Sequence, residues 1–281
     1  MKLFIVAILC LIGSNAYAFG TVYCSHKELC KLAEIIAQEN KITNLNTQSL
    51  VNISGDPHEF EPSTTEIKNL MSASLLLTGP TELNPWIKKI NFQRSKNPTL
   101  KTISLLFDKT MTTLYPNATP EVLSHFWLYP KIYCLMKTKL ESELKAQGLG
   151  LLASKSCNST STESNLNLAL RKTLFPIILT HDALLPLLKN LDPNHNIVAI
   201  KGSGHHEETS AQAIKKMYDS LRAPIVIWVI EANINVPQNI LSKIRVNDLV
   251  IKLDTAKSND NTPFFALNDL TEKLNKLSEK K

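Results

Sequence analysis

The chain has 281 residues, of which 43% are hydrophobic, and its 31 Lys and Arg against 25 Asp and Glu give a formal net charge of +6. The basic residues are spread singly among Asn, Ser and Thr, and aromatic residues make up only 6% of the chain. This pattern predicts a solvated basic surface and argues against nucleic-acid binding, which favours an Arg-rich or aromatic-interleaved stripe.

The N-terminal segment predicts export. A charged start precedes an apolar run over residues 3–12, and an A-x-A pattern ends at Ala18. These features indicate a signal peptide over residues 1–18 that is cleaved after Ala18. The apolar run is shorter than the roughly 20 residues of a membrane-spanning helix. We therefore expect a periplasmic protein with no stable membrane insertion after cleavage.

Four cysteines follow this segment: Cys24, Cys30, Cys134 and Cys157. In an oxidising compartment an even number permits two disulfides, with three possible connectivities. Neither local spacing is a C-x-x-C metal or redox pattern. Local pairing, Cys24 with Cys30 and Cys134 with Cys157, is the expected arrangement.

The N-terminal half predicts alternating strands and helices. Apolar residues at helical spacing, such as Leu29, Leu32 and Ile36, follow a first strand at 21–24. Ser63-Thr64-Thr65-Glu66 resembles a capping box that begins a helix. Further strands are expected at Leu50–Ile53, 74–78 and 102–106.

After Pro130 the alternation stops and later resumes. A charged helical stretch ends near Gly148, and a Ser/Thr/Asn-rich segment from Ser154 to Asn165 predicts a loop. Beyond it, expected helices alternate again with expected strands at 177–180, 197–201, 225–230 and 249–253. A terminal amphipathic helix carries a stripe of leucines.

Residues that can bind a metal follow several of these strands. His58, His181, Glu231 and Asp254 each come at or shortly after a strand end, where ligands bind in open α/β sheets. Together with His125, they offer three imidazoles and two carboxylates, and three imidazoles with one carboxylate are a set that Zn²⁺ accepts. We predict metal ligation by His58, His125, His181 and Asp254, with Glu231 as the rival fourth ligand.

The expected fold class is α/β, with two lobes, each a parallel sheet flanked by helices. A helical connector joins the lobes, and the metal site lies in the interlobe cleft because its ligands are spread over both. The expected division is a signal peptide over 1–18, an N-terminal lobe over 19–130, a connector and loop over 131–165, and a C-terminal lobe over 166–281.

Four motifs also resemble those of the zinc/manganese-binding periplasmic solute-binding proteins of bacterial metal ABC importers. Asp56-Pro57-His58-Glu59-Phe60-Glu61-Pro62-Ser63 is similar to the first ligand motif of that family. His125-Phe126-Trp127-Leu128-Tyr129-Pro130 resembles the second, although Tyr129 replaces a small or acidic residue. Thr180-His181-Asp182-Ala183 resembles the third, and Leu253-Asp254-Thr255 falls where the family places its last carboxylate.

The resemblance implies a monomeric binding protein, not an enzyme, that delivers its metal to the membrane permease of an ABC importer. It implies the same four ligands, His58, His125, His181 and Asp254. Zn²⁺ is favoured over Mn²⁺, because the third position is a histidine and imidazoles suit zinc better than a hard, oxygen-preferring ion.

Alternatives remain at this point. A manganese-binding member of the same family is one, and an exported zinc-dependent hydrolase that uses the same histidines is another, although the chain lacks H-E-x-x-H. His205 and His206 follow a strand and either capture metal or occupy a polar turn. His26 is expected to be an ordinary loop histidine, and Trp127 to pack in the core.

Overall fold

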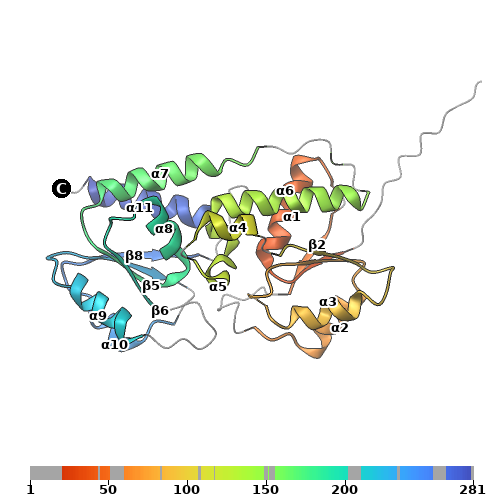
Figure 1. Ribbon diagram of the computed structural model, residues 1–281, viewed down its shortest axis with the longest axis horizontal. Coiled ribbons are helices and arrows are strands. Elements are labelled where there is room, and N and C mark those ends of the chain that lie inside the picture. Colours follow the sequence, from red (N-terminus) through yellow and green to blue (C-terminus); the bar gives the residue numbers. More distant parts are fainter. Residues whose placement is uncertain are drawn as a thin grey trace, which may run out of the picture.

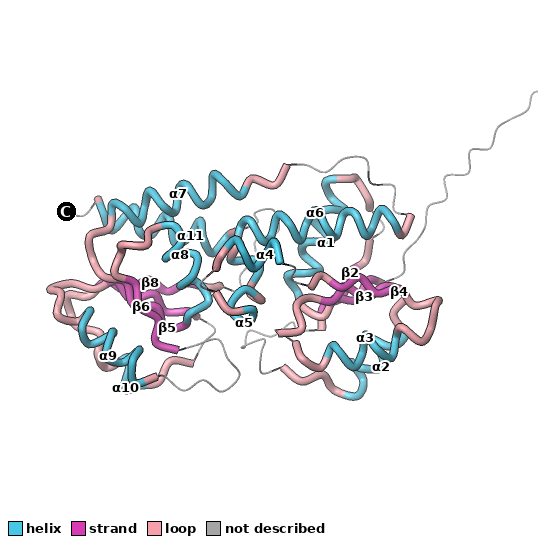
Figure 2. The backbone as a smooth tube through the Cα atoms, viewed as in Figure 1, coloured by secondary structure: helices cyan, strands magenta, loops and turns pink. Residues whose placement is uncertain are grey.

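The structure, a computed structural model, describes residues 21–43, 45–50, 60–82, 84–106, 109–116, 118–148, 151, 156–201, 210–232, 235–255 and 264–279. Figure 1 shows two lobes side by side, with helices along one side of both. Each lobe holds its own four-stranded parallel sheet, drawn in magenta in Figure 2. The expected fold class, two parallel α/β lobes joined by helices, is confirmed.

The N-terminal sheet has the strand order β2-β1-β3-β4. All four residues of β3 are buried, as in a parallel strand covered on both faces. Helices α1 and α6 (Pro130–Ala146) lie over one face, and α2 and α3 over the other (Figure 1). The elements are β1 (Val22–Cys24), α1 (Lys27–Glu39), β2 (Thr47–Ser49), α2 (Thr64–Ser72), β3 (Leu75–Thr78), α3 (Ile87–Arg94), β4 (Lys101–Ser104), α4 (Lys109–Leu114), α5 (Pro120–Leu123) and the 3₁₀ turn η2 (Phe126–Leu128).

The C-terminal sheet has the order β6-β5-β7-β8, and every residue of β5 is buried. Helices α7 (Ser159–Lys172), α8 and α11 lie on one side of this sheet, and α9 and α10 on the other (Figure 1). The elements are β5 (Ile177–His181), the 3₁₀ turn η3 (Asp182–Leu184), α8 (Leu185–Leu191), β6 (Ile197–Lys201), α9 (Ala211–Ser220), β7 (Ile227–Glu231), α10 (Gln238–Leu241), β8 (Leu249–Leu253) and α11 (Phe265–Ser278).

Local sequence signals begin several helices where expected. The capping box of α2 is present: the Ser63 hydroxyl accepts from the Glu66 amide, and the Glu66 carboxylate accepts from the Ser63 amide. At the start of α1, Nδ1 of His26 accepts a hydrogen bond from the Glu28 amide at 3.2 Å. These contacts satisfy amide groups that have no partner within the helix.

The connection between the lobes consists of two helices, α6 (Pro130–Ala146) and α7 (Ser159–Lys172). The loop expected from Ser154 to Asn165 is shorter than predicted. Asn158 caps α7 by accepting a hydrogen bond from the Ser161 amide at 3.2 Å, so the hydroxyl-rich residues after it form the first helical turn. The expected boundary between residues 165 and 166 therefore falls inside α7.

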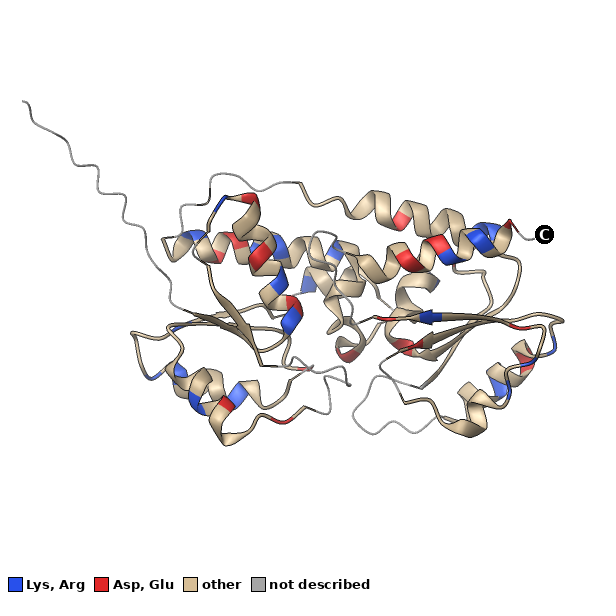
Figure 3. Ribbon diagram, turned by 180° about the vertical axis from the view of Figure 1, so that it is seen from behind, with Lys and Arg blue, Asp and Glu red and all other residues tan. Residues whose placement is uncertain are grey.

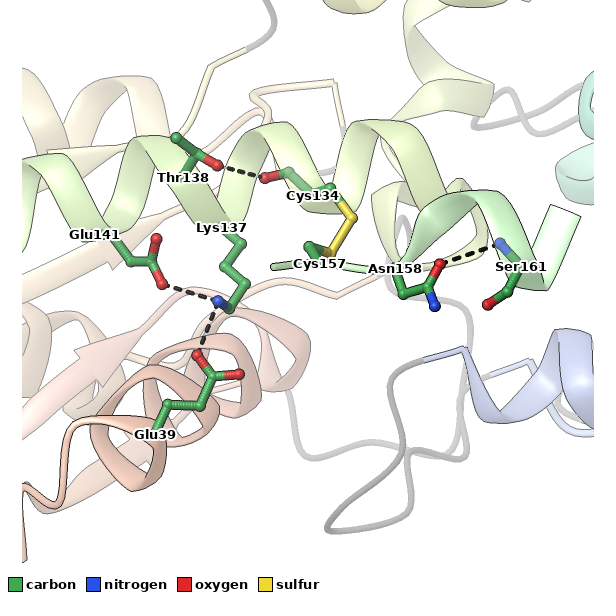
Figure 4. The surroundings of a disulfide bond; sticks show 8 residues. All are labelled: Glu39, Cys134, Lys137, Thr138, Glu141, Cys157, Asn158 and Ser161. Atoms are coloured by element: carbon green, nitrogen blue, oxygen red, sulfur yellow. Dashed lines mark hydrogen bonds and ion pairs between the residues drawn. A yellow bond between two sulfur atoms is a disulfide. The ribbon is translucent and has the colours of Figure 1, made fainter. Parts of the chain in front are cut away.

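Both expected disulfides are present. Cys24–Cys30 joins β1 to α1, and Cys134–Cys157 joins α6 to the segment just before α7. Figure 4 shows the second bond beside Lys137, whose ammonium binds carboxylates on both α1 and α6. A covalent bond thus bridges the interruption between the two connecting helices.

One edge strand was not predicted. β2 at Thr47–Ser49 pairs with β1 at the edge of the N-terminal sheet. An edge strand need not be strongly apolar, so this short polar segment carried no clear strand signal. Of the strand predicted at Leu50–Ile53, Leu50 is in a bend, and residues 51–53 lie outside the described ranges.

Apolar packing holds the two lobes together. One large cluster of buried side chains extends from β1 and α1 through α6 and α7 to α11 and the C-terminal sheet. Two smaller clusters lie under the opposite faces of the sheets, beneath α2 and α3 and beneath α9 and α10.

Basic and acidic residues are mixed on the helices of both lobes (Figure 3). Among the residues described, no helix has the length and apolar character that a membrane span requires.

Candidate metal centre

The topology of the C-terminal sheet brings metal-competent side chains to one edge. β5 has β6 on one side and β7 on the other, so the direction of winding reverses between β5 and β7. His181 ends β5 and Glu231 ends β7. Asp254 comes one residue after Leu253, which is paired with Glu231. This carboxyl edge at the switch point is where ligands bind in open α/β sheets.

Glu231 supports His181 from within the same lobe. Its Oε1 lies 3.3 Å from Nδ1 of His181, and both side chains are buried. Its other carboxylate oxygen accepts a hydrogen bond from the Thr255 hydroxyl at 2.8 Å, and its amide donates to the Thr180 hydroxyl at 3.2 Å. A carboxylate beside one ring nitrogen sets the tautomer of an imidazole. The contact favours a proton on Nδ1, which leaves Nε2 as the nitrogen suited to a metal ion.

His125 has the same arrangement in the N-terminal lobe. It precedes η2, and its Nδ1 lies 3.2 Å from the Val122 carbonyl oxygen. A carbonyl can only accept, so Nδ1 carries the proton and Nε2 keeps its lone pair. The residue is 6% exposed. Neutral imidazoles with one nitrogen so held are typical metal ligands.

The two imidazoles approach each other across the lobes. The ring centroids of His125 and His181 are 5.5 Å apart, and the rings meet edge to face at 73°. With Zn–N distances of about 2.0–2.1 Å and a tetrahedral angle, the ring centroids of two histidines on one zinc ion lie roughly 5 Å apart. The observed spacing therefore fits two ligands of a single ion.

Trp127 joins the lobes beside this pair. Its ring stacks on His26 at a centroid distance of 4.7 Å and meets His125 edge-on at 5.4 Å. Its Nε1 donates to the Thr255 carbonyl oxygen at 2.9 Å, next to Asp254. Trp127 is partly buried against the main core, as predicted, but it also links the His125 segment to the end of β8.

Of the four predicted ligands, the structure brings two into contact. His125 and His181 face each other, and Asp254 is half-buried at the same edge. His58 lies in residues 51–59 and His205 and His206 in residues 202–209, outside the described ranges. Within the residues the structure describes, no three His, Cys, Asp or Glu side chains gather closely enough to hold a metal ion.

Three further residues of the site were not predicted as such. His26 is not an ordinary loop histidine, because it caps α1 and stacks on Trp127. Thr255 bonds Glu231 through its hydroxyl, and Tyr129 bonds the segment after His181. Thr255 and Tyr129 lie within the fourth and second ligand motifs, and that is the sequence signal that could have pointed to them.

Solved structures share this fold. A crystal structure of ZnuA is similar at a TM-score of 0.62 and 18% identity, covering 92% of this chain and 98% of that one. The periplasmic zinc-binding protein TroA from Treponema pallidum has a TM-score of 0.63 and 14% identity, covering 90% and 97%. The laminin-binding protein Lmb of Streptococcus agalactiae, described as an adhesin with metal-transporting activity, has a TM-score of 0.64 and 17% identity, covering 92% and 98%. No curated protein matches the sequence significantly.

The two-lobed α/β fold of this chain is the one that these solved structures share. Residues 22–150 match the model of the family described as zinc-uptake complex component A, periplasmic. This match over the N-terminal part of the chain and the shared fold agree with the resemblance drawn from the motifs. This family consists of transport components, which agrees with the prediction that the chain is not an enzyme.

Proposed function

We propose that this chain binds one zinc ion between its lobes and delivers it to the permease of an ABC importer. The observation that carries the proposal is the pair His125 and His181, which come from different lobes with ring centroids 5.5 Å apart. In both residues an acceptor faces Nδ1, so both present Nε2 as a ligand. His58 and Asp254 complete the proposed set of four.

The position of Glu231 supports Asp254 as the carboxylate ligand. Glu231 already uses one oxygen on Nδ1 of His181 and the other on the Thr255 hydroxyl. It thus acts as the outer carboxylate that orients a ligating histidine. Asp254 lies at the same edge, is half-buried and belongs to the fourth ligand motif, so we assign the metal-binding carboxylate to it.

The donor set supports zinc over manganese. Three imidazoles and one carboxylate complete a tetrahedral site, which leaves no open position for a catalytic water. Mn²⁺ prefers oxygen ligands and would gain less from three nitrogen donors. A closed site also suits reversible carriage rather than hydrolysis.

Both disulfides support an oxidising compartment, in agreement with export to the periplasm. We propose that the signal peptide over 1–18 is cleaved after Ala18, and that the mature protein acts as a monomer. N-terminal sequencing of protein recovered from the periplasm of an expression host checks the cleavage site, with Phe19 as the expected first residue.

The test of zinc binding is a competitive titration of the metal-stripped protein, with manganese as the comparator. We expect one zinc ion per chain, a sub-micromolar dissociation constant and much weaker manganese binding. The variants His58→Ala, His125→Ala, His181→Ala and Asp254→Ala each weaken binding.

His195→Ala is the matched control, since His195 is a mostly buried histidine whose Nε2 bonds the Phe175 carbonyl away from the site. Tight zinc binding that survives loss of His125 and His181 would contradict the proposal. If manganese binds more tightly than zinc, the proposed site would stand, but its metal would be manganese.

A further inference from the structure

Tyr129 makes a direct hydrogen bond between two of the ligand motifs. Its hydroxyl donates to the carbonyl oxygen of Ala183 at 2.6 Å, across 54 residues of sequence. Tyr129 is four residues after His125, and Ala183 is two residues after His181. Both Tyr129 and Ala183 are fully buried. The bond therefore ties the segment that carries one histidine to the segment that carries the other.

Each end of this bond is rigidly related to its histidine. On one side, the Leu128 amide donates to the His125 carbonyl at 2.8 Å, and the Tyr129 amide to the Phe126 carbonyl at 3.1 Å. η2 is thus a closed turn between the two side chains. On the other side, Ala183 lies in η3, the turn that follows His181 directly. A shift at either end of the bond consequently moves an imidazole.

The hydroxyl remains a donor under all physiological conditions. Burial raises the pKa of Tyr129 well above its usual range, and the nearby charges of Asp182 and Glu231 raise it further. The Ala183 carbonyl can only accept, so the direction of the bond is settled. Without the hydroxyl, this carbonyl would lose its donor in a fully buried place, which is unfavourable.

We infer that Tyr129 is a positioning residue for the metal site, which sets the placement of His181 relative to His125 through the Ala183 carbonyl. The inference rests on the proposed zinc function. The second ligand motif of the similar family normally has a small or acidic residue at this position, where this chain has a tyrosine. The hydrogen bond to Ala183 is therefore a feature of this chain and is not implied by the motif.

A neighbouring tyrosine provides the matched control. Tyr115 meets Tyr129 edge to face at a centroid distance of 4.9 Å and is 1% exposed. Its hydroxyl donates to Glu163 on α7 at 2.8 Å, not to a ligand segment. Tyr115→Phe and Tyr129→Phe thus each remove a hydroxyl from one of two adjacent buried rings. The two variants differ in the hydrogen-bond acceptor that loses its donor.

The experiment measures zinc dissociation constants for the wild type, Tyr129→Phe and Tyr115→Phe, together with unfolding of each metal-free protein. We expect Tyr129→Phe to weaken zinc binding by about 10-fold or more, as loss of an outer partner of a ligand does. Tyr115→Phe should leave it within about twofold of the wild type, since its hydroxyl contacts no ligand segment.

A spectroscopic readout separates positioning from stability. The visible absorption of the Co²⁺-loaded protein reports ligand geometry, and it should change in Tyr129→Phe but not in Tyr115→Phe. Replacing Tyr129 with 4-aminophenylalanine keeps a donor at the same place and should restore both the affinity and the spectrum. If Tyr129→Phe does not fold, 4-fluorophenylalanine, which fills the volume without donating, takes its place.

The outcomes distinguish the two proposals. A wild type without a zinc site would overturn the proposed function. A wild type that binds zinc, with equal affinities and equal spectra for the two phenylalanine variants, would overturn the role of Tyr129 alone.

Discussion

The two lobes contribute to the site in different ways. In the C-terminal lobe the strands have five residues each, and β5 and β7 end in His181 and Glu231. In the N-terminal lobe the strands have three or four residues and end in Cys, Ser or Thr. The histidine that this lobe contributes to the pair is His125, which precedes the turn η2 and does not end a strand.

This difference determines how each histidine is held. His181 is supported within its own lobe, since the neighbouring Glu231 forms hydrogen bonds with both Thr180 and Thr255. The turn after His125 is held by contacts that cross to the other lobe, Trp127 to Thr255 and Tyr129 to Ala183. The C-terminal lobe thus presents a prepared half-site, whereas the N-terminal contribution depends on how the lobes are joined.

The largest expected effect is loss of the prepared half-site. His181→Ala removes a ligand and leaves Glu231 buried without its imidazole. Loss of an outer partner of a ligand lowers metal affinity by about 10–100-fold, and loss of this ligand should lower the zinc affinity by more than that. His125→Ala should weaken binding less, because the Glu231 network stays intact. Competitive zinc titration measures both. Equal losses would show that the two lobes contribute equally.

A second prediction concerns how α6 is held to the N-terminal lobe. The Lys137 ammonium lies 2.8 Å from both Glu39 on α1 and Glu141 on α6, and its side chain is 4% exposed. Lys137→Met leaves two carboxylates facing each other without a cation, so the free energy of unfolding should fall by about 4 kcal/mol. Denaturant unfolding measures this, and hydrogen exchange should locate the loosening in α1.

The triple variant Lys137→Met, Glu39→Gln, Glu141→Gln is the control, and it should recover most of the stability because no uncompensated charge remains. If the triple variant is as unstable as Lys137→Met, packing rather than charge holds α6 to α1.

The same ion cluster predicts that its contribution to the stability of the fold is lost at alkaline pH. Burial alone lowers the pKa of Lys137, but the hydrogen bonds and charges of Glu141 and Glu39 outweigh it and raise the pKa above its usual value. A raised pKa stabilises the fold below the unfolded pKa of about 10.4. The contribution is lost as pH rises through the folded-state pKa. The stability difference between wild type and Lys137→Met should thus stay constant from neutral pH to about pH 10 and shrink above it.

The smallest expected effect is the difference in stability between variants that lack one or the other disulfide. Cys134–Cys157 closes 23 residues and Cys24–Cys30 closes 6, which corresponds to about 3 and about 2 kcal/mol of chain entropy. Replacing each pair with alanines should lower stability in that order. Only loss of Cys134–Cys157 should also weaken zinc binding, because that bond joins α6 to the segment before α7. Zinc affinities that change equally in both variants would contradict this division.

Much of the fold could be predicted from the sequence because the signals are local. Apolar runs predicted the strands of the C-terminal sheet, and the capping box at Ser63 predicted the start of α2. Prediction was wrong where a tertiary contact outweighs composition. The hydroxyl-rich stretch after Asn158 is the start of a helix, in which the buried Glu163 binds Tyr115 and Lys131 from other parts of the fold.

The sequence by itself predicted which residues bind a metal, because ligand chemistry depends on the side chain and its motif. It also indicated both disulfides and the two-lobed class of fold. Only the tertiary structure decided that Glu231 supports His181 and that Trp127 and Tyr129 link the lobes. Such contacts join residues 50 to 128 positions apart, and which of them meet depends on strand order and lobe packing, which no local pattern encodes.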